Sequence, residues 1–269
     1  MCVLVDFTKM NGAGNDFVLI DNRKLGLELT PEQIRKICHR QRGVGADGVL
    51  LLRLARGDAD LGWDFFNSDG SEAEMCGNGA RCFARFAQRH LGERESISFE
   101  TLAGVIESRL SGESVTVGLT PPVDLRVGER IGTASGELEI HSVNTGVPHA
   151  VLFVEDADEA MVSELGHEIR HHEHYAPAGT NVNFVQLTGD GSIRVRTYER
   201  GVGETLACGT GVVASALITA KLHGAGSPVR VRVLGGDDLD VAFEADGNSF
   251  ANMQLTGPAE FVFSGQIKM

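Results

Sequence analysis

Two cysteines in matching short motifs could carry acid/base chemistry. Cys76 opens the sequence CGNGAR and Cys208 opens the sequence CGTG, and each motif leads into a small, apolar segment that is typical of a helix. The unsatisfied N–H groups at a helix start, together with the positive end of the helix dipole, favour thiolate over thiol. The same N–H groups can hold a carboxylate. The two motifs therefore predict a pair of acid/base thiols that act on one anionic substrate.

The surroundings of the two cysteines repeat along the chain. Gly92 follows Cys76 by 16 positions, and Gly224 follows Cys208 by 16 positions, so each glycine can end a helix of about four turns. Each predicted helix follows a strand and precedes short strands joined by turns. We expect an α+β fold of two pseudo-symmetric domains, each a mixed or antiparallel, barrel-like β-sheet wrapped around a central α-helix. The two helix starts would then face each other across a cleft.

A pair of prolines at 121–122 interrupts the pattern of strands and marks the expected domain boundary. We expect an N-terminal domain over residues 1–120 and a C-terminal domain over 121–257. A strand near 258–269 is expected to pack back onto the first domain. The first strand of the second domain is expected near 137–143.

Two further helices are expected outside the cysteine motifs. Thr30, Pro31 and Gln33 predict a helix start with a capping box, and this helix is expected to run to about Gln41. Another helix is expected over about 158–173.

Composition and charge exclude several classes of partner. The 269 residues include 24 Lys and Arg against 37 Asp and Glu, a net charge of −13, which argues against nucleic acid or an anionic membrane. The start of the sequence lacks a signal-peptide pattern, and no run approaches the roughly 18 apolar residues of a membrane span. Five cysteines form no disulfide framework. We therefore expect a cytoplasmic protein with reduced thiols.

Metal, nucleotide and redox chemistry are less consistent with the sequence than acid/base chemistry by the two motif cysteines. The cysteines lack C-x-x-C spacing, and the histidine cluster at 171–174 lacks the i, i+4 pair of a helical zinc site, so we predict no metal. The G-x-G-x-x-G match at 43–48 follows a helix and opens a strand, opposite to a dinucleotide site, and is interpreted as a connecting turn. A dithiol/disulfide pair formed by the two motif cysteines stays an alternative. The other cysteines, Cys2, Cys38 and Cys82, are interpreted as buried apolar residues.

Charged residues near the second motif are further candidates. Glu199 and Arg200 end a predicted strand a few residues before Cys208. Arg200 suits a carboxylate, since a guanidinium can bind one in bidentate fashion. His149 also borders a predicted strand, but a lone histidine is commonly structural, and the pattern alone leaves its role open.

The chain resembles the diaminopimelate epimerase family. The resemblance extends over nearly the whole length and keeps the order of the family's motifs. The matching stretches are Lys9–Phe17 (KMNGAGNDF), Arg42–Gly48 (RGVGADG), Asn67–Cys82 (NSDGSEAEMCGNGARC), Gly146–His149 (GVPH), Gly179–Phe184 (GTNVNF) and Glu199–Gly211 (ERGVGETLACGTG).

This resemblance implies inversion of LL-2,6-diaminopimelate to meso-diaminopimelate, in lysine and peptidoglycan precursor biosynthesis. It implies a two-base mechanism without a cofactor, in which one thiolate removes the α-proton and the opposite thiol delivers a proton to the other face. The implied partners are a small diamino dicarboxylic acid and a second copy of the chain in a homodimer.

The resemblance also implies roles for individual residues. Cys76 and Cys208 would be the catalytic pair, and His149 and Glu199 would tune the thiols or orient the substrate. Backbone donors would stabilise the reacting carboxylate, as the weak acidity of an amino acid α-proton requires. The implied backbone donors are Gly77, Asn78, Gly209 and Thr210, and the implied side-chain contacts to substrate are Asn15, Asn67, Asn181, Glu199 and Arg200.

Two positions depart from the pattern of many family members. Val147 stands where many have Asn, and Gly48 stands where some have Gln. These departures concern the far end of the substrate, so a racemase or epimerase of another amino acid, of the histidine or hydroxyproline type, stays the first alternative. A thiol redox protein or a non-catalytic binding protein is the alternative from a different class.

Overall fold

The computed structural model describes residues 4–134, 136–247 and 249–269, so Cys2 lies outside the described residues. The chain divides into two compact units. The first unit contains the chain up to Gly118 together with Gly257–Met269, and the second contains Leu119–Thr256.

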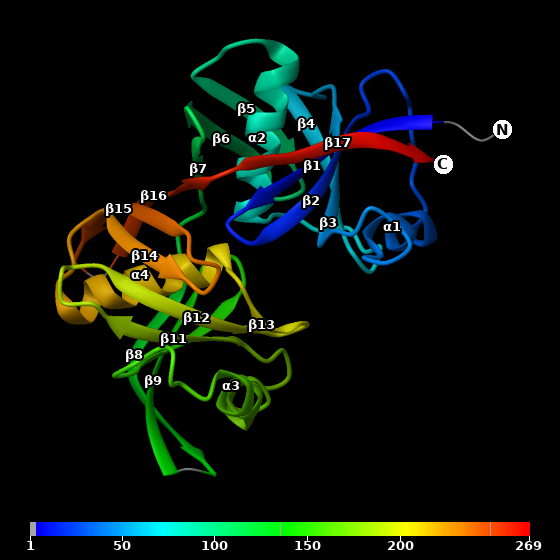
Figure 1. The fold of residues 1–269 in the computed structure, drawn as a ribbon. Helices are drawn as coiled ribbons and strands as arrows, with labels where there is room; N and C mark the ends of the chain where they lie inside the picture. Colours follow the sequence, from blue (N-terminus) through cyan, green and yellow to red (C-terminus); the bar gives the residue numbers. More distant parts are fainter. Residues whose placement is uncertain (1–3, 135, 248) are drawn as a thin grey trace. The chain divides into compact units, whose positions relative to one another are not determined.

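The first unit is a mixed sheet around one helix (Figure 1). Its elements are β1 (Leu4–Gly12), β2 (Asn15–Asp21), α1 (Pro31–Cys38), β3 (Gly48–Arg53), β4 (Leu61–Asn67), α2 (Gly77–Leu91), β5 (Ser96–Thr101), β6 (Gly104–Ser111), β7 (Ser114–Gly118) and β17 (Glu260–Lys268). The strands pair in the order β17-β1-β2-β3-β4-β5-β6-β7. The β2–β3 and β4–β5 pairs are parallel and the others are antiparallel.

The second unit repeats this arrangement. Its elements are β8 (Val123–Thr133), β9 (Gly136–Asn144), β10 (Pro148–Phe153), α3 (Val162–Arg170), the 3₁₀ turn η1 (Glu173–Tyr175), β11 (Asn181–Leu187), β12 (Ile193–Glu199), β13 (Gly203–Thr205), α4 (Gly209–His223), β14 (Val229–Val233), β15 (Asp238–Asp246) and β16 (Ser249–Pro258). The strands pair in the order β8-β9-β10-β11-β12-β14-β15-β16, and β13 pairs with β12. The β10–β11 and β12–β14 pairs are parallel, so the sequence of strand directions is the same in both units.

Each unit wraps its sheet around the helix that a motif cysteine precedes. Helix α2 contacts β1, β2, β3, β5, β6 and β7, and α4 contacts β9, β10, β11, β12, β14 and β15. Around α2 the rings of Trp63, Phe83 and Phe99 pack against one another at centroid distances of 4.8 to 5.6 Å. A helix enclosed in this way is rigidly held by its apolar side chains, so its N-terminus can hold reacting groups in a constant position. The α+β class with two pseudo-symmetric halves is confirmed.

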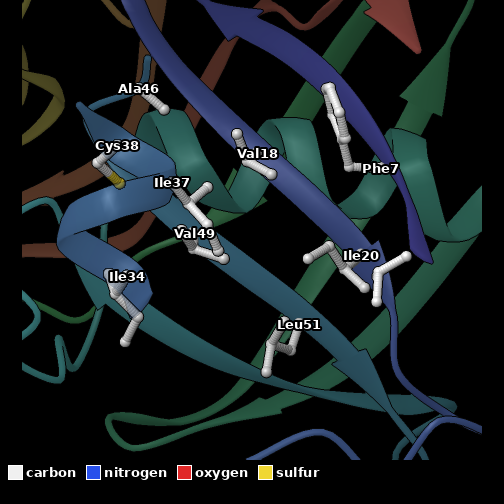
Figure 2. Close-up of a cluster of buried hydrophobic side chains, with 10 residues drawn as sticks. Phe7, Val18, Ile20, Ile34, Ile37, Cys38, Ala46, Val49 and Leu51 are labelled. Carbon is white, nitrogen blue, oxygen red and sulfur yellow. The ribbon is translucent and has the colours of Figure 1, made fainter. Parts of the chain in front are cut away.

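A second layer of apolar contacts covers the other face of the first sheet. Figure 2 shows Ile34, Ile37 and Cys38 of α1 beside Val18 of β2 and Val49 of β3. The capping box is confirmed at the start of α1, because the Thr30 hydroxyl accepts from the Gln33 amide and the Gln33 side chain accepts from the Thr30 amide.

The predicted end of that helix at Gln41 is wrong. Helix α1 ends at Cys38, because His39 has an extended backbone and the carbonyls of Ile37 and Cys38 accept from the amides of Gly45 and Ala46 instead of from a further helical turn. The segment 43–48 then connects α1 to β3, so its interpretation as a connecting turn is confirmed.

Two other elements differ from the sequence prediction. Helix α3 covers Val162–Arg170 rather than 158–173, because the amides of His171 and His172 close the last turn and His172 then caps η1. Strand β8 precedes the first strand that was expected in the second domain. Most of its side chains are exposed, so it lacks the alternation of apolar and polar residues that identifies a strand.

Candidate active site

Both motif cysteines stand at helix starts, as predicted. Cys76 immediately precedes α2 and Cys208 immediately precedes α4, and both have an extended backbone with φ of −146° and −123°. Their carbonyls accept the first helical bonds, from Ala80 and Val212, each at 2.8 Å. The N–H groups of the first helical residues therefore point out of the helix start, where they can bind an anion.

The cysteines predicted to be structural, Cys38 and Cys82, lie within α1 and α2 and not at a helix start. Cys38 is 5% exposed and Cys82 is fully buried. Burial raises the pKa of each of these thiols to about 12, so both stay protonated at neutral pH. Their interpretation as buried apolar residues is confirmed.

In the first unit, a directed chain of hydrogen bonds runs from α2 to Asp47. Arg81 donates to the Asn78 Oδ1 at 2.8 Å, and Asn78 Nδ2 donates to the Asn15 Oδ1 at 2.6 Å. Asn15 Nδ2 in turn donates to the Asp47 carboxylate at 3.1 Å. Because Arg81 can only donate and the Asp47 carboxylate accepts, the orientation of both amides is determined.

Asp47 is itself held by a network of charges. Arg40 bridges Asp47 and Asp16 at 2.8 and 2.9 Å, and Lys9 pairs with Asp16 at 2.7 Å. Burial alone would raise the pKa of Asp16, but hydrogen bonds from Arg40 and Lys9 outweigh it and leave that pKa below its ordinary value. The network keeps Asp47 in position for Asn15.

In the second unit, His149 lies at the centre of another chain of hydrogen bonds. Its Nε2 is 2.9 Å from the Thr210 hydroxyl, and its Nδ1 is 3.1 Å from the Asn183 side-chain amide. The Thr210 hydroxyl is 3.5 Å from the Cys208 Sγ. Burial lowers the pKa of His149 to about 3, with a smaller contribution from the charge of Arg200, so the ring is neutral at physiological pH.

The remaining candidates of the second unit surround the end of β12. Asn181 Oδ1 accepts from the backbone N–H of Arg200 at 2.9 Å, and Glu199 accepts from the Thr205 hydroxyl at 2.6 Å. Arg200 also donates from its guanidinium to the Ala178 carbonyl at 3.3 Å. A guanidinium carries five N–H donors, so this bond leaves donors for a carboxylate ligand.

The neutral state of His149 predicts a dependence of stability on pH. Between about pH 6.5 and 3 the unfolded chain binds a proton that the folded chain excludes, so the free energy of unfolding falls as the pH falls through this range. At pH 5 the loss from this residue is expected to be about 2 kcal/mol. Urea unfolding of the unsubstituted protein and of His149→Gln at pH 7 and pH 5 measures it. The expected result is a larger loss in the unsubstituted protein, and equal losses would contradict the prediction.

The predicted site residues divide between the two units. The first unit brings Asn15 and Asn78 together at the start of α2, and the second brings His149, Thr210 and Cys208 together at the start of α4. Asn67 is not part of the chain of hydrogen bonds from Arg81 to Asp47. It ends β4 and donates to Ser71 at 3.1 Å.

Three buried or half-buried residues complete these chains, and sequence reasoning assigned them no role. They are Asp47, Arg81 and Asn183. Each lies inside a motif that carries the family resemblance, so the motifs themselves were the available signal. Asp47 and Asn183 contact partners 32 and 34 positions away along the chain, which only the strand pairing reveals, whereas Arg81 and Asn78 are three positions apart in α2.

Over residues 4–134, 136–247 and 249–269, no three His, Cys, Asp or Glu side chains gather in a way that could hold a metal ion. Within the same ranges, no helix has the length and apolar character needed to cross a membrane.

Comparison with solved structures identifies the fold. The chain is similar to a hydroxyproline epimerase from Agrobacterium vitis, with a TM-score of 0.73 and 19% identity over 99% of this chain and 93% of that one. It is also similar to a phenazine biosynthesis protein of the PhzF family from Bacillus anthracis, with a TM-score of 0.74 and 16% identity over 98% and 99%. At these identities the likeness concerns the fold alone.

Comparison of sequences identifies the family. The family described as diaminopimelate epimerase matches residues 7–124 and 141–262. The chain is 46% identical to a diaminopimelate epimerase of Hydrogenobaculum, covering 97% of both chains, and 45% identical to one of Aquifex aeolicus, covering 98% of both. It is 42% identical to that of Archaeoglobus fulgidus over 98% of this chain and 97% of the other. The chain therefore belongs to the diaminopimelate epimerase family.

Proposed function

We propose that this protein is an isomerase that inverts one α-carbon of LL-2,6-diaminopimelate to give meso-diaminopimelate, for the biosynthesis of lysine and peptidoglycan precursors. Family membership over nearly the whole chain carries this proposal. The two cysteines at the starts of enclosed helices support it, because the reaction needs one base and one acid at defined positions.

Cys76 and Cys208 are the proposed acid/base pair. The thiolate of one removes the α-hydrogen as a proton, so the C–H bond breaks, an S–H bond forms and the electron pair stays on the substrate. The thiol of the other then gives its proton to the opposite face of the same carbon. The reverse reaction exchanges the two roles, and the chemistry requires no cofactor.

Backbone donors at the helix starts stabilise the charge that develops in this reaction. When the α-carbon loses its proton, negative charge spreads onto the adjoining carboxylate. The N–H groups of Gly77, Asn78, Gly209 and Thr210 belong to the first turns of α2 and α4, where helical bonding leaves them available. Donors already in place need no reorganisation as the charge forms, which makes such stabilisation effective.

The distal end of the substrate determines which amino acid reacts. Asn67, Asn181 and Arg200 are the proposed contacts for the distal amino and carboxylate groups, and Asn15 and Glu199 complete the substrate contacts. Arg200 is suited to a carboxylate, and its backbone is held by Asn181 at 2.9 Å. An amino acid without a distal carboxylate would leave this arginine without its ligand and should react poorly.

We expect the protein to act in the cytoplasm as a homodimer. This expectation follows from the family resemblance described above. Sedimentation velocity measures the oligomeric state, and a monomer at micromolar concentration would contradict this expectation.

The function is tested by exchange of α-hydrogen with deuterated solvent and by the stereochemistry of the product, under reducing conditions. Both LL- and meso-diaminopimelate should exchange and interconvert. Lysine, histidine and hydroxyproline are the comparison substrates, and they should react at least about 100-fold more slowly. Exchange with one of these and none with diaminopimelate would replace the proposed substrate with another amino acid of the same reaction class.

A further inference from the structure

The side-chain amide of Asn183 has a single possible orientation. Its Nδ2 is 2.9 Å from the Ala150 carbonyl oxygen and 3.1 Å from the His149 Nδ1. A carbonyl oxygen can only accept, so the NH₂ group of Asn183 must face it. The Oδ1 of Asn183 then accepts from the Thr197 hydroxyl at 2.9 Å. Asn183 is fully buried, so these contacts account for both its hydrogens and its oxygen.

This orientation determines the tautomer of His149. One amide hydrogen of Asn183 points at Nδ1, so Nδ1 must be the unprotonated, accepting nitrogen of the ring. The neutral ring then carries its hydrogen on Nε2 and donates it to the Thr210 hydroxyl oxygen, 2.9 Å away. Protonation of Nδ1 would place two donors against each other, and burial and the charge of Arg200 also disfavour the imidazolium.

The tautomer in turn directs the hydroxyl hydrogen of Thr210. Because the oxygen accepts from His149, its own hydrogen must point to another acceptor. The Cys208 Sγ lies 3.5 Å away, within the reach of a hydrogen bond to sulfur. A hydrogen bond to the charged form of an acid stabilises that form, so this donor favours the thiolate of Cys208.

We propose that Asn183 is a positioning residue for Cys208: it holds the hydrogen of His149 on Nε2 and thereby turns the Thr210 hydroxyl toward the sulfur as a thiolate-stabilising donor. The relevance of this series of hydrogen bonds to catalysis rests on the proposed function. The series of hydrogen bonds can be tested without substrate, since it joins four residues of one unit: Asn183, His149, Thr210 and Cys208.

The first measurement uses the unsubstituted protein with ¹⁵N-labelled histidine. Long-range ¹H–¹⁵N correlation spectra distinguish the two neutral tautomers and the imidazolium, and the His149→Gln variant assigns the resonance. The Nε2–H tautomer is expected throughout pH 6 to 8. An Nδ1–H tautomer or an imidazolium in this range would overturn the proposal.

The second measurement follows alkylation of Cys208 by iodoacetamide as a function of pH, with the modified peptide quantified by mass spectrometry. Each rate is divided by its plateau at high pH, which cancels differences in access. At pH 7, Asn183→Leu and Thr210→Val are each expected to slow the normalised rate at least about tenfold, as loss of a hydrogen bond to a charged acceptor implies. Thr210→Ser keeps the hydroxyl and should keep the rate within about twofold.

A matched control and a double variant complete the test. Ser215→Ala removes another buried hydroxyl of α4, one that bonds only to the Gly211 carbonyl among the described contacts, and should leave the pH profile unchanged. The normalised alkylation rate of the double variant Asn183→Leu/Thr210→Val should equal that of the slower single variant, because both substitutions break the same series of hydrogen bonds. Additive slowing would overturn the proposal. If Asn183→Leu fails to fold, the tautomer of the unsubstituted protein and the Thr210 variants still decide it.

The two proposals can fail independently. A protein with the expected tautomer and pH profile but no activity on diaminopimelate would contradict the proposed function alone. A protein that epimerises diaminopimelate with His149 in the other tautomer would contradict the positioning role of Asn183 alone.

Discussion

Replacement of either motif cysteine by alanine is expected to reduce the rate of inversion by at least about 1,000-fold, the scale of a lost general acid or base. In the two-base mechanism, inversion needs a proton acceptor on one face of the α-carbon and a proton donor on the other. Cys76→Ala and Cys208→Ala each leave one face without either group. The rate is measured from the stereochemistry of the product, starting separately from LL- and meso-diaminopimelate.

Exchange of α-hydrogen separates the two faces. A variant with one thiol can still remove a proton and return a solvent deuteron to the same face, so exchange without inversion is expected for one of the two configurations at the reacting carbon. The configuration that still exchanges in Cys208→Ala identifies the face that Cys76 serves, and Cys76→Ala should show the opposite preference. Retained inversion in either variant would refute the two-thiol mechanism.

Cys38→Ala is the matched control for these variants. Cys38 is buried in α1, where burial raises the pKa of its thiol to about 12. Its removal should leave the rate of inversion within about twofold and lower the free energy of unfolding by about 1 kcal/mol, because only apolar packing is lost.

Gly211→Ala is expected to lower the free energy of unfolding by about 3 kcal/mol, the upper range for overpacking in a close-packed interior. Gly211 lies in the first turn of α4, where alanine would suit the helical backbone. A Cβ at this position would lie 2.3 Å from the Asn183 Oδ1 and 3.3 Å from the Thr197 hydroxyl. Asn183 is fully buried and is held by hydrogen bonds with Ala150, His149 and Thr197, which a shift of its side chain would break.

The pseudo-symmetric position offers the control for Gly211. Gly79 occupies the same place in the first turn of α2, but a Cβ there would meet its nearest atoms, in Phe17 and Cys76, at 3.5 and 3.6 Å. These are ordinary contact distances, so Gly79→Ala should keep the stability or raise it by up to about 1 kcal/mol. Urea unfolding of both variants measures the difference. Equal destabilisation would show that the space around Asn183 is not what requires glycine at 211.

Local features were predictable from the sequence because their causes lie within a few residues. The capping box at Thr30 and the helix starts after Cys76 and Cys208 follow from short-range hydrogen bonding and from glycine placement. The equal spacing of Cys76–Gly92 and Cys208–Gly224 indicated two halves of one plan, and the matching order of strand directions in the two units confirms that plan.

Elements whose signals depend on burial were predicted less well. Strand β8 was missed because its side chains are mostly exposed and its pairing with β9 comes from backbone hydrogen bonds. Helix α3 was predicted too long. Hydrogen bonds from the His171 and His172 amides close its last turn, and the composition of the segment does not reveal where such bonds form.

The sequence by itself determined the family, the two helix starts and the identity of the candidate thiols, because these depend on residue types in short, ordered motifs. Only the tertiary structure decided which groups control them. His149 could not be told from a structural histidine until the parallel pairing of β10 with β11 brought it within reach of Asn183, and the fold of α4 brought it to Thr210. The tautomer of a buried ring depends on donors and acceptors that lie 34 and 61 positions away along the chain, and the register of β10 with β11 and the position of α4 set those contacts.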